Sequence, residues 1–314
     1  MGTTVQRLTG AQIIAEYLAR QGVTHAAGIP GHGVWTLTDA LLDCPQIRTV
    51  QVMHEQSAVH LADGFYRASG RPMLAFTSIG PGATNTVIGM ATAYVDSTAI
   101  ALFTGSPHTY MRGHGLLQEL ERRHAADNPR IFEPVVKEWW QPSRVDDLPF
   151  VLHRAWNAMT TGRPGPILMD VPMDIQAATA DVTLPDPAAR EARGRPRPDA
   201  TNVERAARLL AEAKRPVIVA GGGAITAEAS DALRALAERL GAPASRSRSR
   251  RRSSSSSTSM SARSGRTIRS PCRWWAMRAR AWRTSSRPSA AASRAPTTAT
   301  RSPTCAGHGR SRSR

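Results

Sequence analysis

Glu55 is the residue of this chain whose type and setting are best suited to chemistry. It lies in the stretch Met53-His54-Glu55-Gln56, between a β-branched segment, Ile47–Val52, that predicts a strand and the start of a predicted helix. A carboxyl group there can hydrogen-bond a bound molecule and relay a proton, and ligands of open α/β sheets bind at the carboxyl ends of strands. By itself, a glutamate in the first turn of a helix is more simply explained by the helix dipole, so its neighbours must decide.

A glycine-rich turn provides the second signal. The stretch Ser78–Asn85 reads Ser-Ile-Gly-Pro-Gly-Ala-Thr-Asn and follows a predicted strand, Met73–Thr77. Glycines let the backbone approach a ligand closely, although a plain turn from a strand into a helix has a similar composition. Pro30-Gly31 forms another such turn after the predicted strand Val23–Ile29.

Together these stretches resemble the pyrimidine-binding domain of thiamine-diphosphate enzymes of the acetolactate synthase type, with a resemblance that covers roughly Leu8 to Pro243. The resemblance implies that Glu55 is catalytic. It would hydrogen-bond the pyrimidine ring, so that the cofactor's own amino group can take the proton from the thiazolium carbon. The cofactor-binding residues that the resemblance implies are Pro30, Gly31, Glu55, Pro81, Gly82 and Asn85.

Further stretches extend the resemblance and add candidates on the substrate side. Leu117-Gln118-Glu119 matches the family's Phe-Gln-Glu, in which the glutamine faces the active site. Val136-Lys137 resembles a segment whose lysine lies near the active-site mouth. Thr161–Pro166, with Asp170-Val171-Pro172 beyond it, resembles the last strand of the domain. The resemblance thus makes Gln118 and Lys137 substrate-side candidates.

His32 departs from the acetolactate pattern, which usually has a small residue after Pro-Gly. Gly105-Ser106 departs as well, because that pattern has Gly-Gln there. Gly31-His32-Gly33 is closer to the trihydroxycyclohexanedione hydrolase of inositol breakdown, which leaves C–C hydrolysis open as an alternative. His32 is then either a substrate-side acid, base or donor, or a turn histidine without a catalytic role. Glu55 disfavours glyoxylate carboligase, a relative that lacks this glutamate.

The elements that must position these residues alternate between strands and helices. Thr9 predicts the N-cap of a first helix and Gly22 its end. The further strands are predicted at Ala99–Thr104 and Ile167–Val171, and the further helices at Val34–Leu42, from Glu55 onward, and at Thr84–Tyr94. This alternation predicts the α/β class, with βαβ units and a doubly wound parallel sheet over residues 1–180.

A linker and a second domain follow in the prediction. Residues 181–200 are rich in Pro, Arg and Asp and predict a linker. Residues 201–243 predict the truncated start of a Rossmann-like central domain, with helices at Asn202–Ala213 and Ala227–Leu240 around a strand at Pro216–Ala220. Gly221-Gly222-Gly223 is weak as a nucleotide motif. FAD, which some relatives bind near this region, is left open.

Residues 244–314 have a different composition. They hold 19 Ser, 18 of the chain's 41 Lys and Arg, and none of its 24 Asp and Glu, so the first 243 residues carry 23 basic against 24 acidic groups. Such a tail predicts disorder. We interpret it as a frameshift product, because the neighbouring frame of Ile268–Trp282, written with GC-rich codons, resembles the family's central domain. An Arg/Ser-tailed RNA-binding protein is the remote alternative, since the tail's charge predicts non-specific affinity for nucleic acid.

The resemblance implies thiamine diphosphate as cofactor, with Mg²⁺ and the diphosphate held on a C-terminal domain through Gly-Asp-Gly and a later Asn. The chain contains no Gly-Asp-Gly, and Ala62-Asp63-Gly64 lies on a predicted helix. Hence we expect no metal ligands in this chain and no activity by itself. A separate partner chain that supplies the missing domain is a further alternative.

The implied substrate is a 2-oxo acid, for carboligation or decarboxylation in a homodimer or tetramer. Only Cys44 lies in the first 243 residues, so a disulfide framework is excluded there and a reducing compartment fits. No apolar run approaches the ~20 residues that span a bilayer, and no signal peptide is evident. The sequence therefore predicts a cytoplasmic protein without a membrane partner.

Overall fold

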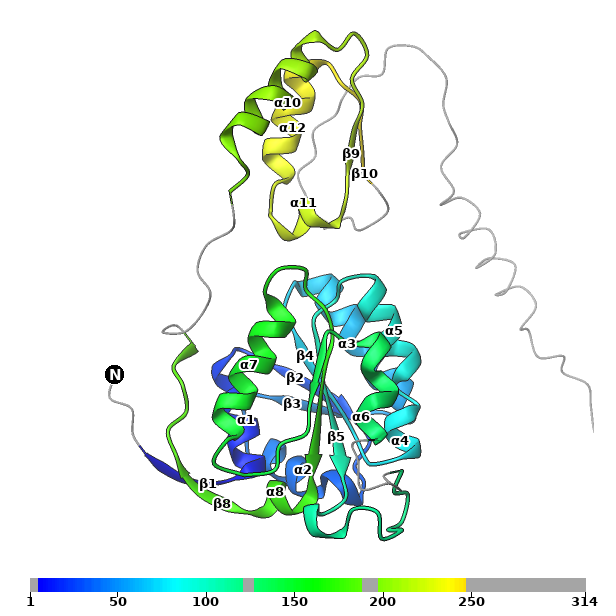
Figure 1. Cartoon of the computed structure of the whole chain (residues 1–314), viewed down its shortest axis with the longest axis vertical. Coiled ribbons are helices and arrows are strands. Elements are labelled where there is room, and N and C mark those ends of the chain that lie inside the picture. The colour runs from blue at the N-terminus through cyan, green and yellow to red at the C-terminus, as the bar shows by residue number, and fades with distance from the viewer. Residues whose placement is uncertain (1–4, 121–126, 188–196, 247–314) are drawn as a thin grey trace, which may run out of the picture. The chain divides into compact units, whose positions relative to one another are not determined.

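A six-stranded parallel sheet forms the centre of the first domain in the computed structural model, which describes residues 5–120, 127–187 and 197–246 (Figure 1). The strand order is β3-β2-β4-β5-β7-β6. The strands are β2 (His25–Gly28), β3 (Arg48–Gln51), β4 (Met73–Thr77), β5 (Ile100–Ser106), β6 (Glu138–Trp140) and β7 (Ile167–Pro172). The order reverses direction between β2 and β4, as in doubly wound sheets, and the predicted fold class is confirmed.

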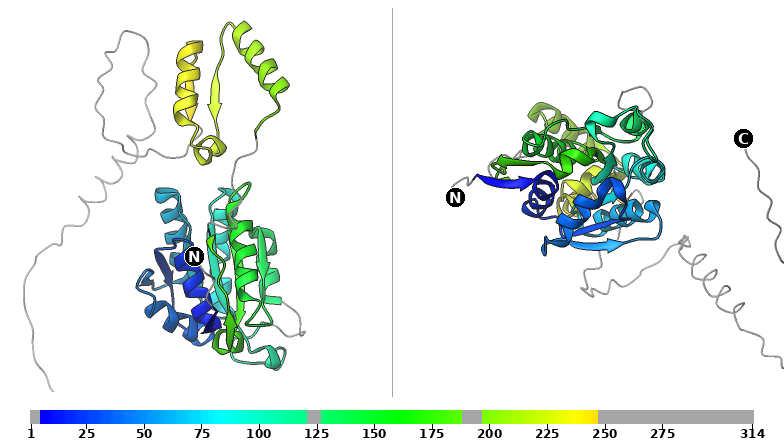
Figure 2. Two further views of the ribbon diagram at one scale, coloured as in Figure 1. Left: turned by 90° about the vertical axis from the view of Figure 1, so that its left-hand side faces the viewer. Right: turned by 90° about the horizontal axis from the view of Figure 1, so that it is seen from below.

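Helices cover both faces of this sheet (Figures 1 and 2). The first face packs against α1 (Gly10–Arg20), α2 (Trp35–Leu42) and α7 (Leu148–Thr160), and the second against α3 (Glu55–Ser69), α5 (Val87–Val95) and α6 (Asp127–Phe132). Within β4, Leu74 and Phe76 belong to the first core, whereas Met73 and Ala75 belong to the second. This alternation follows from the two-residue period of a strand and explains why the central strands are apolar throughout.

The two ends of the first domain meet in an antiparallel pair. β1 (Gln6–Thr9) pairs with β8 (Thr179–Val182), which follows the short helix α8 (Met173–Ala177). Thr9 then caps α1 as predicted. Its Oγ1 accepts from the backbone N–H of Gln12 at 3.2 Å, and Oε1 of Gln12 accepts from the backbone N–H of Thr9 at 2.9 Å. Because Val182 and Leu184 are buried, the segment expected as a linker from residue 181 begins with residues of this core.

The helix expected at Thr84–Tyr94 is broken into two in the structure. α4 (Pro81–Thr84) begins inside the glycine turn with a proline in its first turn, and α5 begins at Val87. Asn85 and Thr86 lie at the break, where the Oγ1 of Thr86 donates to the carbonyl of Ala83 at 2.6 Å. A side-chain hydroxyl that competes for a helix carbonyl favours such an interruption.

The second unit is small and has little core of its own. It consists of α10 (Ala200–Glu212), β9 (Ile218–Ala220), α11 (Gly222–Thr226), α12 (Ser230–Leu240) and β10 (Ala244–Arg246), with β9 and β10 parallel. The helix expected from Ala227 thus begins at Ser230. β10 lies within the segment expected as a tail, and the rest of that tail is outside the described residues.

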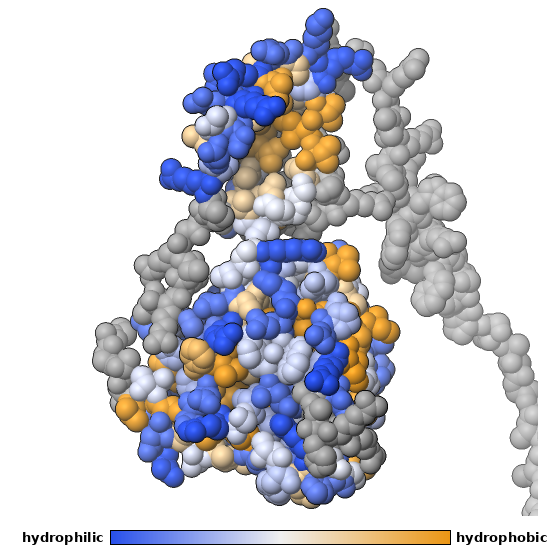
Figure 3. Space-filling view, viewed as in Figure 1, coloured by the Kyte–Doolittle hydropathy of each residue, from blue (hydrophilic) through white to orange (hydrophobic). Residues whose placement is uncertain are grey.

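Apolar side chains remain at the surface of this unit (Figure 3). Val217 and Val219 are 66% and 72% exposed, and no residue of α10 is buried. Strands of parallel sheets normally bury both faces. The described part of the second unit therefore leaves one strand face uncovered.

Candidate functional site

Glu55 lies at the carboxyl edge of the parallel sheet. It is the first residue of α3 and follows β3 after a short turn. The Nδ1 of His54 caps the helix by accepting from the backbone N–H of Gln56 at 3.1 Å. The side chain of Glu55 is half-buried. The helix start thus presents a carboxylate where strands of an open sheet end.

The glycine turn after β4 brings a donor to this carboxylate. The Nδ2 of Asn85 donates to Oε2 of Glu55 at 2.9 Å. The other oxygen, Oε1, faces Gly82: a Cβ at Gly82 would stand 3.4 Å from Oε1 and 2.9 Å from Oγ1 of Thr77. The amide therefore orients the carboxyl group, and the absence of a side chain lets the backbone of Gly82 lie close to Glu55 and Thr77.

The Pro30–Gly33 segment contacts the same turn. A Cβ at Gly31 would stand 2.7 Å from Cβ and 2.9 Å from Oγ of Ser78, and the N–H of Gly33 donates to that Oγ at 3.2 Å. From the other side, Nε2 of Gln176 donates to the carbonyl of Gly33 at 2.7 Å. Glu55, Gly82, Asn85, Pro30 and Gly31 thus converge on one edge, on the loops after β2, β3 and β4.

His32 lies at the same edge of the sheet, because it directly follows Gly31 in the chain. It opens the 3₁₀ turn η1 (His32–Val34) and is half-buried. Its Nε2 is buried, and no hydrogen-bond partner for it is found among the described residues. A buried ring nitrogen without a partner is unfavourable by itself, and it is available to a ligand group.

Gln118 approaches the glycine turn through its backbone rather than its side chain. Its carbonyl oxygen stands 2.0 Å from the position that a Cβ of Gly80 would take, so only glycine fits at Gly80. Its side chain is exposed. The structure therefore brings Gln118 next to the turn that carries Gly82 and Asn85.

Lys137 lies at the opposite, amino edge of the sheet. It directly precedes β6, and its Nζ donates to the carbonyls of Ala158 and, at 3.0 Å, of Thr161 at the end of α7. Burial lowers the pKa of Lys137. A lysine on the last carbonyls of a helix satisfies acceptors that the helix leaves free, and within this chain Lys137 is not brought together with Glu55.

Asp170 and Gln176 join elements of this domain through buried hydrogen bonds, and neither was among the predicted site residues. The carboxylate of Asp170 is fully buried in β7 and accepts from Oγ1 of Thr104 at 2.6 Å, Nδ2 of Asn128 at 2.9 Å and Nε2 of Gln141 at 2.7 Å. It ties β5, α6 and the segment after β6 together. The available signal was a charged residue inside an otherwise apolar strand, which must find partners when buried.

Metal-ligating clusters and membrane-spanning helices are both absent from the described residues. In residues 5–120, 127–187 and 197–246, no group of three or more His, Cys, Asp or Glu side chains is placed to hold a metal ion. No helix of these ranges has the length and apolarity needed to cross a membrane.

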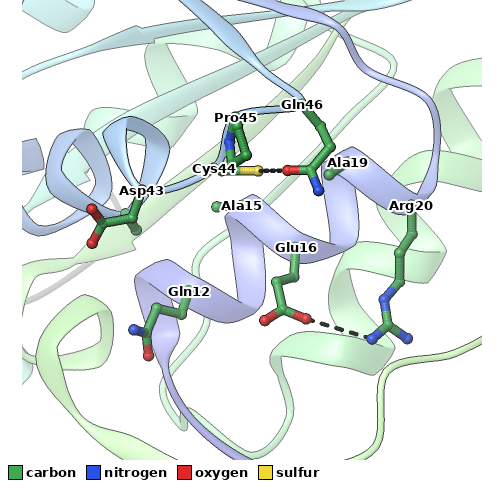
Figure 4. Close-up of a pocket in the computed structure, with 10 residues that line it drawn as sticks. Gln12, Ala15, Glu16, Ala19, Arg20, Asp43, Cys44, Pro45 and Gln46 are labelled. Carbon is green, nitrogen blue, oxygen red and sulfur yellow. Dashed lines mark hydrogen bonds and ion pairs between the residues drawn. The ribbon is translucent and has the colours of Figure 1, made fainter.

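One surface hollow lies away from Glu55, between α1 and the turn after α2 (Figure 4). Sγ of Cys44 donates to Oε1 of Gln46 at 3.2 Å, and Glu16 pairs with Arg20 at 3.5 Å. The turn at Asp43–Gln46 leads into the amino end of β3, whereas Glu55 follows its carboxyl end. This hollow contains none of the predicted site residues.

Two family models match the chain. Residues 8–126 match the model described as thiamine pyrophosphate enzyme, N-terminal TPP binding domain, and residues 203–278 match the central domain of the same enzymes. The second match extends past Pro243 into the Arg/Ser-rich segment.

Curated relatives are named acetolactate synthase large subunits. The chain is 34% identical over 239 residues to that of Buchnera aphidicola subsp. Schizaphis graminum, which is 75% of this chain and 41% of the relative. A probable acetolactate synthase large subunit of Methanocaldococcus jannaschii is 38% identical over 74% of this chain and 39% of its own length. Isozyme 3 of Escherichia coli is 37% identical over 76% and 41%. The chain thus spans about two fifths of the length of these relatives.

Proposed function

Because this chain belongs to the thiamine-pyrophosphate enzymes of the acetolactate synthase type, we propose that its carboxyl edge binds the pyrimidine half of thiamine diphosphate for a reaction of a 2-oxo acid. The contact between Asn85 and Glu55 across two separate loops carries the proposal. It holds a half-buried, oriented carboxylate beside Gly82, whose backbone can lie close to Glu55 and Thr77 because it carries no side chain.

The residues present fit this half of the cofactor. Glu55 would hydrogen-bond the pyrimidine and hold or release one proton there, and Asn85 would keep its carboxyl group in that orientation. Gly82 and Gly31 would let the backbone approach the ring, with Pro30 and Pro81 restricting the two turns. When bound, thiamine diphosphate supplies the carbon nucleophile that attacks the 2-oxo acid.

For the diphosphate half of the cofactor, the described residues contain no candidate Mg²⁺ ligand cluster. Mg²⁺ requires several oxygen ligands in addition to phosphates, and no candidate cluster is present there. We therefore assign no Mg²⁺ site to the described residues. We propose that a further domain, on the same polypeptide or on a partner chain, provides the metal site, and that assembly into a dimer or tetramer completes the pocket. A cytoplasmic location is part of the same proposal.

His32 supports a second candidate reaction at the same site. Its buried Nε2 lies in a 3₁₀ turn that contacts Ser78, where an added donor or base would act on substrate rather than on the cofactor. C–C hydrolysis of the trihydroxycyclohexanedione type would use such a group. Comparing carboligation and hydrolysis by His32→Ala in an enzyme with both cofactor-binding domains separates the two: loss of hydrolysis alone favours the second candidate.

Binding of the cofactor to the purified chain tests the main proposal. Thiamine diphosphate is titrated into ¹⁵N-labelled protein while the amide signals of Gly31, Gly82 and Asn85 are followed by NMR. We expect weak, saturable shifts confined to these loops, which Glu55→Gln reduces and Glu133→Gln, a change at an exposed position of the 3₁₀ turn η3 (Glu133–Val135), leaves unchanged. Shifts that map elsewhere, or that ignore Glu55→Gln, would remove the assignment.

A further inference from the structure

Residues 107–120, the described part of the loop between β5 and α6, fold around the buried carboxylate of Glu119. The side chain of Glu119 is 4% exposed and accepts the backbone N–H groups of Gly113, Gly115 (2.7 Å) and Leu116 (2.9 Å). Hydrogen bonds to an ionised acceptor are stronger than neutral ones. Three backbone donors on one carboxylate therefore fix the conformation of this loop just before Gln118.

Gln118 is held in a conformation that a non-glycine residue seldom adopts. Its φ is 64°, in the left-handed region. This conformation is unfavourable for a non-glycine residue, so surrounding contacts must hold it in place. Its carbonyl oxygen lies against Gly80, 2.0 Å from where a Cβ would be, and Gly80 itself has a φ of +60°. The two backbones touch, so the position of the loop and the position of the glycine turn depend on each other.

The far end of the same loop has a separate anchor. Asp174 of α8 accepts from the backbone N–H of Thr109 at 3.0 Å and from its Oγ1 at 2.5 Å. Asp174 thus holds the loop where it leaves β5, whereas Glu119 holds the part that contacts the glycine turn.

We propose that Glu119 is a positioning residue for the candidate site. It holds the backbone of Gln118 against Gly80 and thereby fixes the turn that places Gly82 and Asn85 beside Glu55. This inference rests on the proposed function only in treating the glycine turn as part of a cofactor site. The coupling between the two loops is inferred from their contacts alone.

Hydrogen exchange of the full 314-residue chain, measured by mass spectrometry without any cofactor, tests this coupling. The reporters are the amides of Thr84 and Asn85, which donate to the carbonyls of Gly80 at 2.9 Å and Pro81 at 3.1 Å. In Glu119→Gln, an amide NH₂ replaces one accepting oxygen. We expect exchange at Thr84 and Asn85 to become about tenfold faster, together with exchange at Gly115 and Leu116. Glu133→Gln should change neither region.

Two results would overturn the proposal. Faster exchange confined to the 113–119 loop would make Glu119 a local loop residue, and a uniform increase over the whole first domain would make it a general stabiliser. If Glu119→Gln does not fold, Glu119→Asp keeps the charge with a shorter reach, and unchanged exchange at Thr84 and Asn85 in that variant would contradict the coupling. Because no thiamine diphosphate is present, failure of the proposed function leaves this outcome unaffected.

Discussion

At the scale of single residues, the candidate site depends on how one carboxyl group is held. The amide of Asn85 fixes one oxygen of Glu55, and the backbone of Gly82 lies close to the other. A glutamine at position 55 would keep the size of the side chain but could not exchange a proton with a bound ring. A substitution at position 55 therefore tests the proton chemistry of the site while leaving its structure in place.

The first prediction concerns Glu55→Gln in a protein that also contains the diphosphate-binding domain. General acid–base groups contribute about 10²–10⁴-fold to rate, so we expect turnover of a 2-oxo acid to fall by about that factor while the melting temperature stays unchanged. Steady-state kinetics and thermal unfolding measure the two effects. If the variant keeps most of its activity, Glu55 is not the activating residue.

A second prediction concerns Tyr17, which is 1% exposed in the first core. Burial raises the pKa of its hydroxyl well above the usual range, and the hydrogen bond from Nε2 of Gln21, 2.9 Å long, lowers it only partly. Since the unfolded tyrosine ionises near pH 10, the folded state binds more protons above that pH. The stability that this shift contributes is complete below about pH 10 and is lost as the pH rises further.

Urea unfolding between pH 8 and 11 tests this expectation. In Tyr17→Phe, the alkaline loss of unfolding free energy should be smaller than in the unchanged chain, by up to about 1.4 kcal/mol per pH unit above pH 10. Tyr110→Phe is the matched control, because Tyr110 is 70% exposed. Equal alkaline slopes for all three proteins would contradict a protonated, buried Tyr17.

At the scale of elements, glycines show which contacts the sheet edge requires. A Cβ at Gly105, at the end of β5, would stand 2.3 Å from the carbonyl oxygen of Gly33, whereas a Cβ at Gly64 on α3 meets nothing within 4 Å. The first glycine thus lets two loops of the site touch. The second is an interruption in an exposed helix face that only lowers helix propensity.

The third prediction compares these two glycines. Gly64→Ala should stabilise the first domain by about 0.5–1 kcal/mol, and Gly105→Ala should destabilise it by about 1–3 kcal/mol or more, because backbone atoms must move. Denaturant unfolding of both variants measures the effects. Equal effects of the two changes would mean that β5 and the Gly31–Gly33 turn are not in contact.

At the scale of the whole molecule, the first domain has a six-stranded doubly wound sheet, and the described second unit has two strands and an uncovered apolar face. The proposed pyrimidine site lies in the first domain, and no group of three or more metal-ligating side chains is found among the described residues to hold the Mg²⁺ of a diphosphate. The fourth prediction follows from this: the purified chain alone should not decarboxylate or ligate 2-oxo acids. Measurable product from pure protein would contradict it, and activity restored by a co-purifying chain that carries Gly-Asp-Gly would favour a split enzyme.

The fifth prediction concerns the gene. We propose that residues 244–314 are translated from a shifted frame, since their composition differs from the near-neutral 243 residues before them. Resequencing from the codons of Gly241 onward should find one inserted or deleted base, and the corrected frame should encode Gly-Asp-Gly and a later Asn. An unchanged reading frame would contradict this proposal. The central-domain match, which continues to residue 278, would then belong to the sequence as it is written.

Local patterns in the sequence predicted most of the elements and the residues that they carry. β4 lies where the apolar run predicts it, Thr9 caps α1, and α3 begins at Glu55. These features follow from side-chain periodicity and from capping groups a few residues away, so a single stretch of chain contains enough information. The family resemblance, confirmed by the family models and the relatives, rested on equally short motifs.

Only the tertiary structure decided which of the predicted residues meet. The bond between Asn85 and Glu55, the contact of Gln118 with Gly80, and the convergence on Asp170 all join residues about 30 or more positions apart. Lys137 shows the opposite case, because its motif predicted the site whereas the sheet places it at the other edge. Spacing along the chain fixes the element on which a residue lies. The edge that it reaches depends on strand order and on packing, which no local pattern contains.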